Sequence, residues 1–171
     1  MSLLAMEGLV ALISGAGSGI GLATLEALRG EGARVAALDV APPPARDGVL
    51  PLRGDVTDQA SVDAAVSAVM VRFGGIDVLV NNAGIGAQGN VEENPLDEWQ
   101  RVFDVNVFGM VRLARACLPH LRRSRHAAIV NVARSCRGRA CQSAPATAPA
   151  RARCMRSRSR WRPTTPPRGS G

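Results

Sequence analysis

The sequence contains no lysine and no tyrosine, and aromatic residues make up only 3% of its 171 residues. Without a phenol or an ε-amino group, the chain as written cannot use either as a general acid or base. It also has no apolar run near the roughly 20 residues that a membrane-spanning helix needs. No basic segment precedes the apolar start, so we expect no secretory signal, no membrane contact and a cytoplasmic location.

Charge is distributed unevenly, and every one of the 21 basic residues is an arginine. Residues 1–133 carry 11 arginines and 14 acids, a net charge of −3, whereas residues 134–171 carry 10 arginines and no acid, a net charge of +10. This asymmetry indicates either a nucleic-acid-binding tail or two segments of different origin. Residues 134–171 show neither helical nor strand periodicity, so we expect an irregular, disordered arginine-rich tail that is not a domain.

Cysteine is scarce, with four residues, three of them in that tail. Without a secretory signal, a disulfide framework is not expected. Four residues separate Cys136 from Cys141, and both histidines of the chain lie upstream of the pair. Because zinc needs further ligands at matching spacing, we predict no metal site.

Residues 1–133 alternate short apolar runs with amphipathic segments. Strands are predicted over residues 9–14, 34–38, 49–52, 76–80 and 128–132. Helices are predicted from the glycine-rich turn to about residue 30, from residue 57 or 58 to 73, and over 95–103 and 106–121. Alternation of this kind favours right-handed crossovers and a parallel sheet. We therefore predict one α/β domain over residues 1–133, a doubly wound, Rossmann-like parallel sheet that is incomplete after its fifth strand.

The first predicted strand leads into a glycine-rich turn, Ser-Gly-Ala-Gly-Ser-Gly-Ile-Gly, at residues 14–21. Glycine permits a tight turn, a close approach of backbone to a pyrophosphate, and close packing of helix against sheet. The helix N-terminus adds N–H groups and a partial positive charge for phosphates. The candidate cofactor-binding residues in this turn are Gly15, Ser18, Gly19, Ile20 and Gly21. The alternative interpretation is an ordinary strand-to-helix turn.

An acid ends the second predicted strand. Asp39 lies 18 residues after Gly21. A carboxylate there can accept hydrogen bonds from both ribose hydroxyls of an adenosine, and it repels a 2′-phosphate. We therefore predict NAD as the preferred cofactor and NADP as the less favoured one.

The turn has the spacing G-x-x-x-G-x-G rather than G-x-G-x-x-G, and this spacing resembles the short-chain dehydrogenase/reductase family. Four further stretches are similar to motifs of that family: Gly54-Asp55-Val56-Thr57, Asn81-Asn82-Ala83-Gly84, Asn106-Val107-Phe108-Gly109 and Ile129-Val130-Asn131-Val132-Ala133. The resemblance covers residues 6–133 and rests on five motifs in the same order.

The resemblance implies contacts with the cofactor at Asp55, Val56, Asn82, Ala83 and Gly84. In the family the aspartate binds the adenine amino group, and the N-N-A-G backbone lies near the cofactor ribose. The equivalent of Asn106 kinks the helix that follows it and anchors a proton-relay water. For residues 55, 81 and 82, turn capping is the alternative interpretation.

The resemblance also implies catalytic residues that this chain lacks. In the family a tyrosine acts as general acid and base, a lysine four residues later lowers its pKa, and a serine positions the substrate oxygen. The matching positions here hold Arg134, Thr147 and Arg151, so only Asn106 remains as a catalytic candidate. We expect a family that transfers hydride between nicotinamide and a secondary alcohol or carbonyl, and a chain that is catalytically impaired or inactive. The alternative is a non-catalytic remnant that binds a cofactor, or nucleic acid through its arginines.

The genetic code offers an explanation for residues 134–171. If the reading frame slipped near Ala133, the shifted codons permit serine at position 134 and tyrosine at 147, and lysine at 151 if Arg151 is coded AG. The permitted string from 147 to 151 is Tyr-Ser-Ala-Ser-Lys, and the next 14 codons permit an apolar helix. We therefore interpret residues 134–171 as frame-shifted. An intact relative would act on a small alcohol or carbonyl as a homo-oligomer, whereas we expect this chain to lack that interface and to bind nucleic acid only adventitiously.

Overall fold

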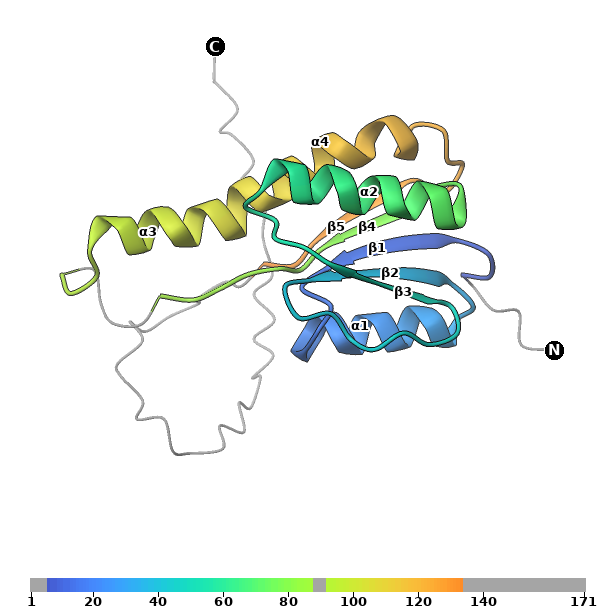
Figure 1. The fold of residues 1–171 in the computed structure, drawn as a ribbon, viewed down its shortest axis with the longest axis horizontal. Helices are drawn as coiled ribbons and strands as arrows, with labels where there is room; N and C mark the ends of the chain where they lie inside the picture. The colour runs from blue at the N-terminus through green and yellow to red at the C-terminus, as the bar shows by residue number, and fades with distance from the viewer. Residues whose placement is uncertain (1–5, 88–91, 134–171) are drawn as a thin grey trace, which may run out of the picture. The chain divides into compact units, whose positions relative to one another are not determined.

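The computed structural model describes residues 6–87 and 92–133, which contain a five-stranded parallel sheet (Figure 1). Its strands are β1 (Val10–Ser14), β2 (Arg34–Asp39), β3 (Val49–Arg53), β4 (Val78–Asn81) and β5 (Ala128–Asn131). Their order in the sheet is β3-β2-β1-β4-β5, and every neighbouring pair is parallel. The predicted α/β, Rossmann-like parallel sheet is therefore confirmed.

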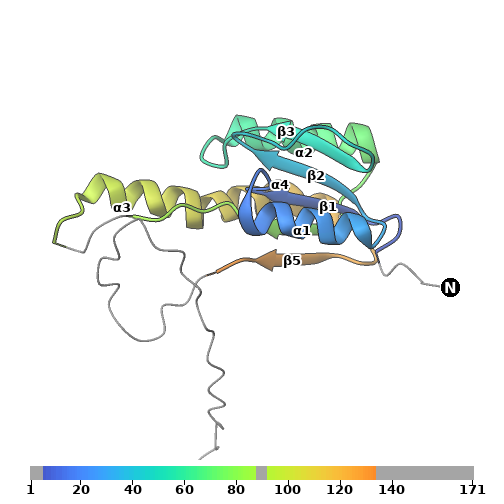
Figure 2. The same ribbon diagram turned by 90° about the horizontal axis from the view of Figure 1, so that it is seen from below.

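Three helices cover the two faces of the sheet: α1 (Gly19–Gly30), α2 (Gln59–Phe73) and α4 (Gly109–Leu121). A fourth helix, α3 (Leu96–Phe103), extends beyond the sheet (Figure 1). Figure 2 shows α1 on one face of the sheet, and α2 and α4 lie on the other. The sequence predicts Thr57 or Asp58 as the cap of α2, and the structure has Asp58 in that place: its carboxylate accepts hydrogen bonds from the N–H groups of Ala60 and Ser61.

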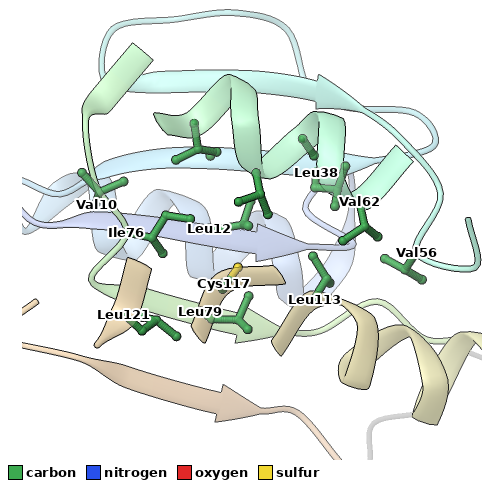
Figure 3. Close-up of a cluster of buried hydrophobic side chains, with 14 residues drawn as sticks. Val10, Leu12, Leu38, Val56, Val62, Ile76, Leu79, Leu113, Cys117 and Leu121 are labelled. Atoms are coloured by element: carbon green, nitrogen blue, oxygen red, sulfur yellow. The ribbon is translucent and has the colours of Figure 1, made fainter. Parts of the chain in front are cut away.

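The two faces bury alternate residues of the same strands, as a period of two requires. In β1, Val10 and Leu12 pack under α2 and α4, whereas Ala11 and Ile13 pack against α1. Figure 3 shows the larger cluster, where β1, β2 and β4 meet α2 and α4. The core therefore extends to the carboxyl ends of β1, β2 and β4, and it holds the loops after them in place.

Most element ends lie within one residue of the prediction, and two differences are larger. The helices predicted over 95–103 and 106–121 are joined, because a π-helical turn, Asp104–Phe108, connects α3 directly to α4. The fourth strand begins at Val78 rather than residue 76, because Asp77 turns its carboxylate toward the sheet and accepts hydrogen bonds from Val10 N–H at 2.8 Å and Ser124 Oγ at 2.5 Å. This carboxylate fastens the start of β4 to β1 and to the loop before β5.

Apolar side chains remain exposed on the outer side of α4 and on β5. The sheet is predicted to be incomplete after its fifth strand, so we expect the helix predicted over 106–121 to lack a packing neighbour. Val107 and Phe108 of the π-helical turn are 44% and 54% exposed, and Val111 and Leu118 of α4 are 51% and 38% exposed. Among the described strands β5 pairs only with β4, and all four of its residues are exposed. Within 6–87 and 92–133, no helix is long and apolar enough to cross a membrane. The predicted tail, 134–171, lies outside the described residues.

Cys117 offers a probe of this core. Its side chain is fully buried on the inner face of α4, and burial raises the pKa of its thiol to about 12. Since the thiolate is the reactive form, we expect Cys117 to react with iodoacetamide far more slowly at pH 8 than the same residue in urea. The raised pKa also affects the free energy of unfolding. Burial of the neutral Cys117 thiol stabilises the fold fully below about pH 9, and this stabilisation is lost as the pH rises toward 12. Peptide mass spectrometry after a short pulse measures this; equal labelling of Cys117 with and without urea would contradict it.

Candidate cofactor site

Two glycines make the turn between β1 and α1 possible. Gly15 has a φ of +68°, in the left-handed region that favours glycine, and its N–H donates to the Leu38 carbonyl at 2.8 Å. A Cβ on Gly15 would lie 2.8 Å from the Cα of Ala83, and one on Gly21 would lie 2.5 Å from Asn82 Nδ2. The start of α1 therefore sits directly on the ends of β1 and β4.

The N-terminus of α1 opens beside this turn. Ser18 precedes the helix with an extended backbone and forms no side-chain cap hydrogen bond. Gly19 is the first helical residue, and the side chain of Ile20 is 58% exposed. Because the first N–H groups of a helix have no partner within it, this end can receive the oxygens of an anion such as a pyrophosphate.

Asp39, at the end of β2, is held firmly in the same region. Its Oδ2 accepts a hydrogen bond from Gly17 N–H at 2.8 Å, and its Oδ1 accepts one from Ala41 N–H at 2.9 Å. Each carboxylate oxygen has two lone pairs, so both oxygens can still accept a bond from a ligand hydroxyl. The carboxylate is thus oriented in advance and keeps its acceptor capacity.

The loop after β3 brings a second carboxylate to this end of the sheet. Asp55 Oδ1 accepts hydrogen bonds from the N–H and the hydroxyl of Thr57, both at 2.8 Å, so the turn-capping interpretation of Asp55 holds. Its own N–H donates to Ser61 Oγ of α2 at 2.9 Å. The neighbouring Val56 is buried under the loop.

Asn82 serves the glycine turn in this structure. Its side-chain Nδ2 donates to the carbonyls of Ser14 and Gly15 at 3.1 and 3.0 Å. The N–H groups of Asn82 and Ala83 both donate to Ser14 Oγ at 3.1 Å. Ser14, which the sequence reasoning missed, is buried and joins the end of β4 to the end of β1. Its polar character at the last position of an otherwise apolar strand is the one signal that could have marked it.

Asn106 lies in the π-helical turn and clamps the chain after β4. Its Oδ1 accepts a hydrogen bond from Ile85 N–H, and its Nδ2 donates to the Ile85 carbonyl, both at 2.8 Å. A Cβ on Gly84 would lie 3.3 Å from Asn106 Oδ1. Turns of π-helix often occur at functional sites, and this one fixes the segment that contains Ala83 and Gly84.

These parts enclose a cavity of about 280 Å³, here called the Asp39 cavity. It is lined by Gly15, Leu38, Asp39, Val40, Gly54, Asp55, Val56, Ala83, Gly84, Ile85, Arg101 and Val105. It lies at the carboxyl ends of parallel strands, where doubly wound sheets bind ligands. Its walls combine apolar side chains with two carboxylates, a composition that fits an adenosine. Six of the predicted cofactor residues line it: Gly15, Asp39, Asp55, Val56, Ala83 and Gly84.

The sequence matches the model of a known protein family. The family model described as short chain dehydrogenase matches residues 9–144. The chain belongs to the short chain dehydrogenase family. This confirms the resemblance drawn from the motifs, and the match ends inside the segment that we interpret as frame-shifted.

Several dehydrogenases of this family are similar in sequence. The 2-(R)-hydroxypropyl-CoM dehydrogenase of Xanthobacter autotrophicus is 41% identical over 138 residues, which cover 72% of this chain and 55% of that protein. The D-threitol dehydrogenase of Mycolicibacterium smegmatis is 38% identical over 138 residues, which cover 75% of this chain and 53% of that protein. The chain therefore spans about half the length of these curated relatives.

Solved structures of the family agree with the fold. A 3-ketoacyl-(acyl-carrier-protein) reductase from Brucella melitensis, complexed with NADH, is 40% identical, with a TM-score of 0.65 over 68% of this chain and 51% of that one. The ligand-free aldohexose dehydrogenase of Thermoplasma acidophilum is 33% identical, with a TM-score of 0.69 over 75% of this chain and 50% of that one. Short chain dehydrogenases are oxidoreductases that bind NAD or NADP, and the Brucella relative is complexed with NADH.

A second cavity, of about 490 Å³, lies beside Asn106 and the end of β5. It is lined by Ala83, Gly84, Ile85, Gly86, Asn106, Met110, Val132 and Ala133. The next residue along the chain, Arg134, stands where the family has its serine, and positions 147 and 151 hold Thr147 and Arg151. These three positions lie outside the described residues. Of the predicted catalytic set, the structure places Asn106 alone at this cavity.

Proposed function

We propose that this chain binds NAD in the Asp39 cavity, in preference to NADP, without turning over a substrate. The observation that carries the proposal is the Asp39 carboxylate, fixed by two backbone N–H groups at the edge of the cavity. A ribose with two free hydroxyls suits two fixed acceptor oxygens, whereas a 2′-phosphate would bring like charges together. The NADH bound by the Brucella relative supports the same cofactor.

The residues present fit a dinucleotide along its length. The N-terminus of α1 at Ser18 and Gly19 suits the pyrophosphate, and Asp55 and Val56 suit the adenine edge and face. Asn82 and Asn106 hold the backbone on which the nicotinamide half would lie. The bound cofactor would supply or accept a hydride; the chain's own residues bind it, orient it and exclude water.

We propose a catalytic activity only for an intact relative of full family length. Such a relative would interconvert a secondary alcohol and a carbonyl, as the dehydrogenase names of the relatives suggest. The present chain has no tyrosine, so it offers no phenol to move the hydroxyl proton. We ascribe residues 134–171 to a frame slip after an NAD-binding domain that ends near Ala133. Adventitious nucleic-acid binding by that segment and a cytoplasmic location stay predictions.

Replacing Asp39 by alanine tests the cofactor assignment. Hydrogen bonds to a charged acceptor contribute about 1.5–3 kcal/mol, so D39A is expected to weaken NADH binding roughly ten-fold or more. NADPH binding should change little or improve, because a repulsive charge is removed. Fluorescence titration of both nucleotides measures the effect. Asp47, an exposed acid that does not line the cavity, supplies the control variant D47A with the same change of charge. Tighter NADPH than NADH binding by the unmodified chain would contradict the assignment.

A further inference from the structure

One wall of the Asp39 cavity comes from α3 and the π-helical turn after it, and it has no counterpart among the residues derived from the motifs. Arg101 and Val105, one helical turn apart, both line the cavity. Asp39 and Asp55 are its two acids, and Arg101 is the one cation among the described residues around it. An arginine at the mouth of a site that favours NAD requires an explanation, because a free guanidinium would attract the 2′-phosphate of NADP.

Glu98 controls how that guanidinium can act. Arg101 Nε donates to Glu98 Oε2 and Arg101 Nη2 donates to Glu98 Oε1, both at 2.9 Å, so the pair is bidentate. This hydrogen bonding lowers the pKa of Glu98 and raises that of Arg101, so both groups stay charged near neutral pH. The pair carries no net charge, and two of the three guanidinium nitrogens are committed. The pair leaves the flat face of the guanidinium and the N–H groups of Nη1 for a ligand.

Guanidinium faces stack on aromatic rings and on nucleobases. We propose that Arg101, held by Glu98, is a further specificity-determining residue of this site: its guanidinium face covers the adenine ring, and Glu98 screens its charge from a 2′-phosphate. The inference rests on the proposed function, since it assumes that the Asp39 cavity takes the adenosine half of the cofactor. It assigns separate tasks to the two residues, stacking to Arg101 and discrimination to Glu98.

The chain contains a second arginine–glutamate pair with the same spacing of three residues. On α1, Arg29 Nε and Nη2 donate to Glu26 Oε2 at 3.2 and 3.1 Å, and Glu26 Oε1 also accepts a hydrogen bond from Arg46 Nη1 at 2.6 Å. Neither Arg29 nor Glu26 lines the Asp39 cavity. R29A is therefore a control for the removal of a paired arginine from a helix, and thermal unfolding of R29A and R101A measures what each replacement costs in stability.

The experiment measures the affinity of the full 171-residue chain for ADP-ribose, NADH and NADPH by calorimetry at low and high salt. R101A and R101K are each expected to weaken ADP-ribose and NADH roughly three- to five-fold at both salt concentrations, because lysine keeps the charge and loses the planar face. E98Q is expected to strengthen NADPH about three-fold at low salt and hardly at all at high salt, because the freed charge is screened. R29A should change none of the three.

Binding results that differ from these contradict either the role of Arg101 and Glu98 or the proposed function. Unchanged ADP-ribose affinity in R101A, or full affinity in R101K, would show that the guanidinium face makes no contact. Equal NADPH affinity in E98Q and the unmodified chain would remove the discriminating role of Glu98. Binding of ADP-ribose but not of NADH would end the proposed function and leave the stacking inference standing, whereas no binding of ADP-ribose would overturn both.

Discussion

The 171-residue chain, incubated with NAD and a panel of secondary alcohols, is expected to give no NADH above background. The family's acid and base is a phenol, and this chain has neither tyrosine nor the lysine that would lower its pKa. Asn106 has both ends of its amide bonded to Ile85, and a carboxamide has no group that ionises near neutral pH, so it cannot replace the phenol. Enzymes commonly turn over about 1–10³ times per second, and absorbance at 340 nm detects far slower rates.

Restoring the reading frame after codon 133 is the matched positive test. The shifted frame permits serine, tyrosine and lysine at 134, 147 and 151 together with an apolar helix, so a gene of full family length is expected to yield turnover. The triple replacement R134S, T147Y and R151K in the present frame should stay inactive, because residues 152–165 still lack the apolar periodicity of that helix. Clear NADH production by the unmodified chain, or by the triple variant alone, would contradict this account.

Local signals explain why so much of the fold could be predicted. The alternation of Val10 to Ile13 across β1, and the Asp58 cap of α2, depend on residues that are neighbours in sequence. The same holds for the glycine turn, whose φ at Gly15 no other residue adopts easily. Such features are fixed by spacing and residue type, and the sequence displays both.

Contacts across the sheet explain why the site could be predicted only in part. The bond from Asn82 Nδ2 to the Ser14 carbonyl joins residues 68 positions apart, and it depends on how β4 lies beside β1. Motif comparison assigns Asn82 to the cofactor, whereas its described contacts are with the glycine turn. Arg101 enters the Asp39 cavity only because the π-helical turn continues α3 into α4, and no local pattern indicates that turn.

The apolar outer surface around α4 and β5 is expected to make the chain associate. The π-helical turn before α4, α4 itself and the edge strand β5 together expose Val107, Phe108, Val111, Leu118, Ile129 and Val130. An exposed apolar strand edge recruits other chains, and apolar patches beyond a few hundred Å² favour association. The matched segment covers only 55% and 53% of two of the relatives, and we propose that the remainder of those proteins covers the residues equivalent to these. The present chain is therefore expected to express poorly in soluble form, or to associate and bind a hydrophobic dye.

Single polar replacements test whether this surface, rather than any exposed apolar residue, causes the association. F108S and V111S should lower dye fluorescence and the associated fraction, whereas V71S should leave both unchanged, because Val71 is 89% exposed on α2, away from α4 and β5. The frame-restored protein should be a soluble oligomer with one cooperative thermal transition. Light scattering after size-exclusion chromatography and a dye-binding titration measure these outcomes. A monodisperse monomer of the 171-residue chain with a sharp transition would show that five strands suffice, since exposure of α4 and β5 would then carry no penalty in solution.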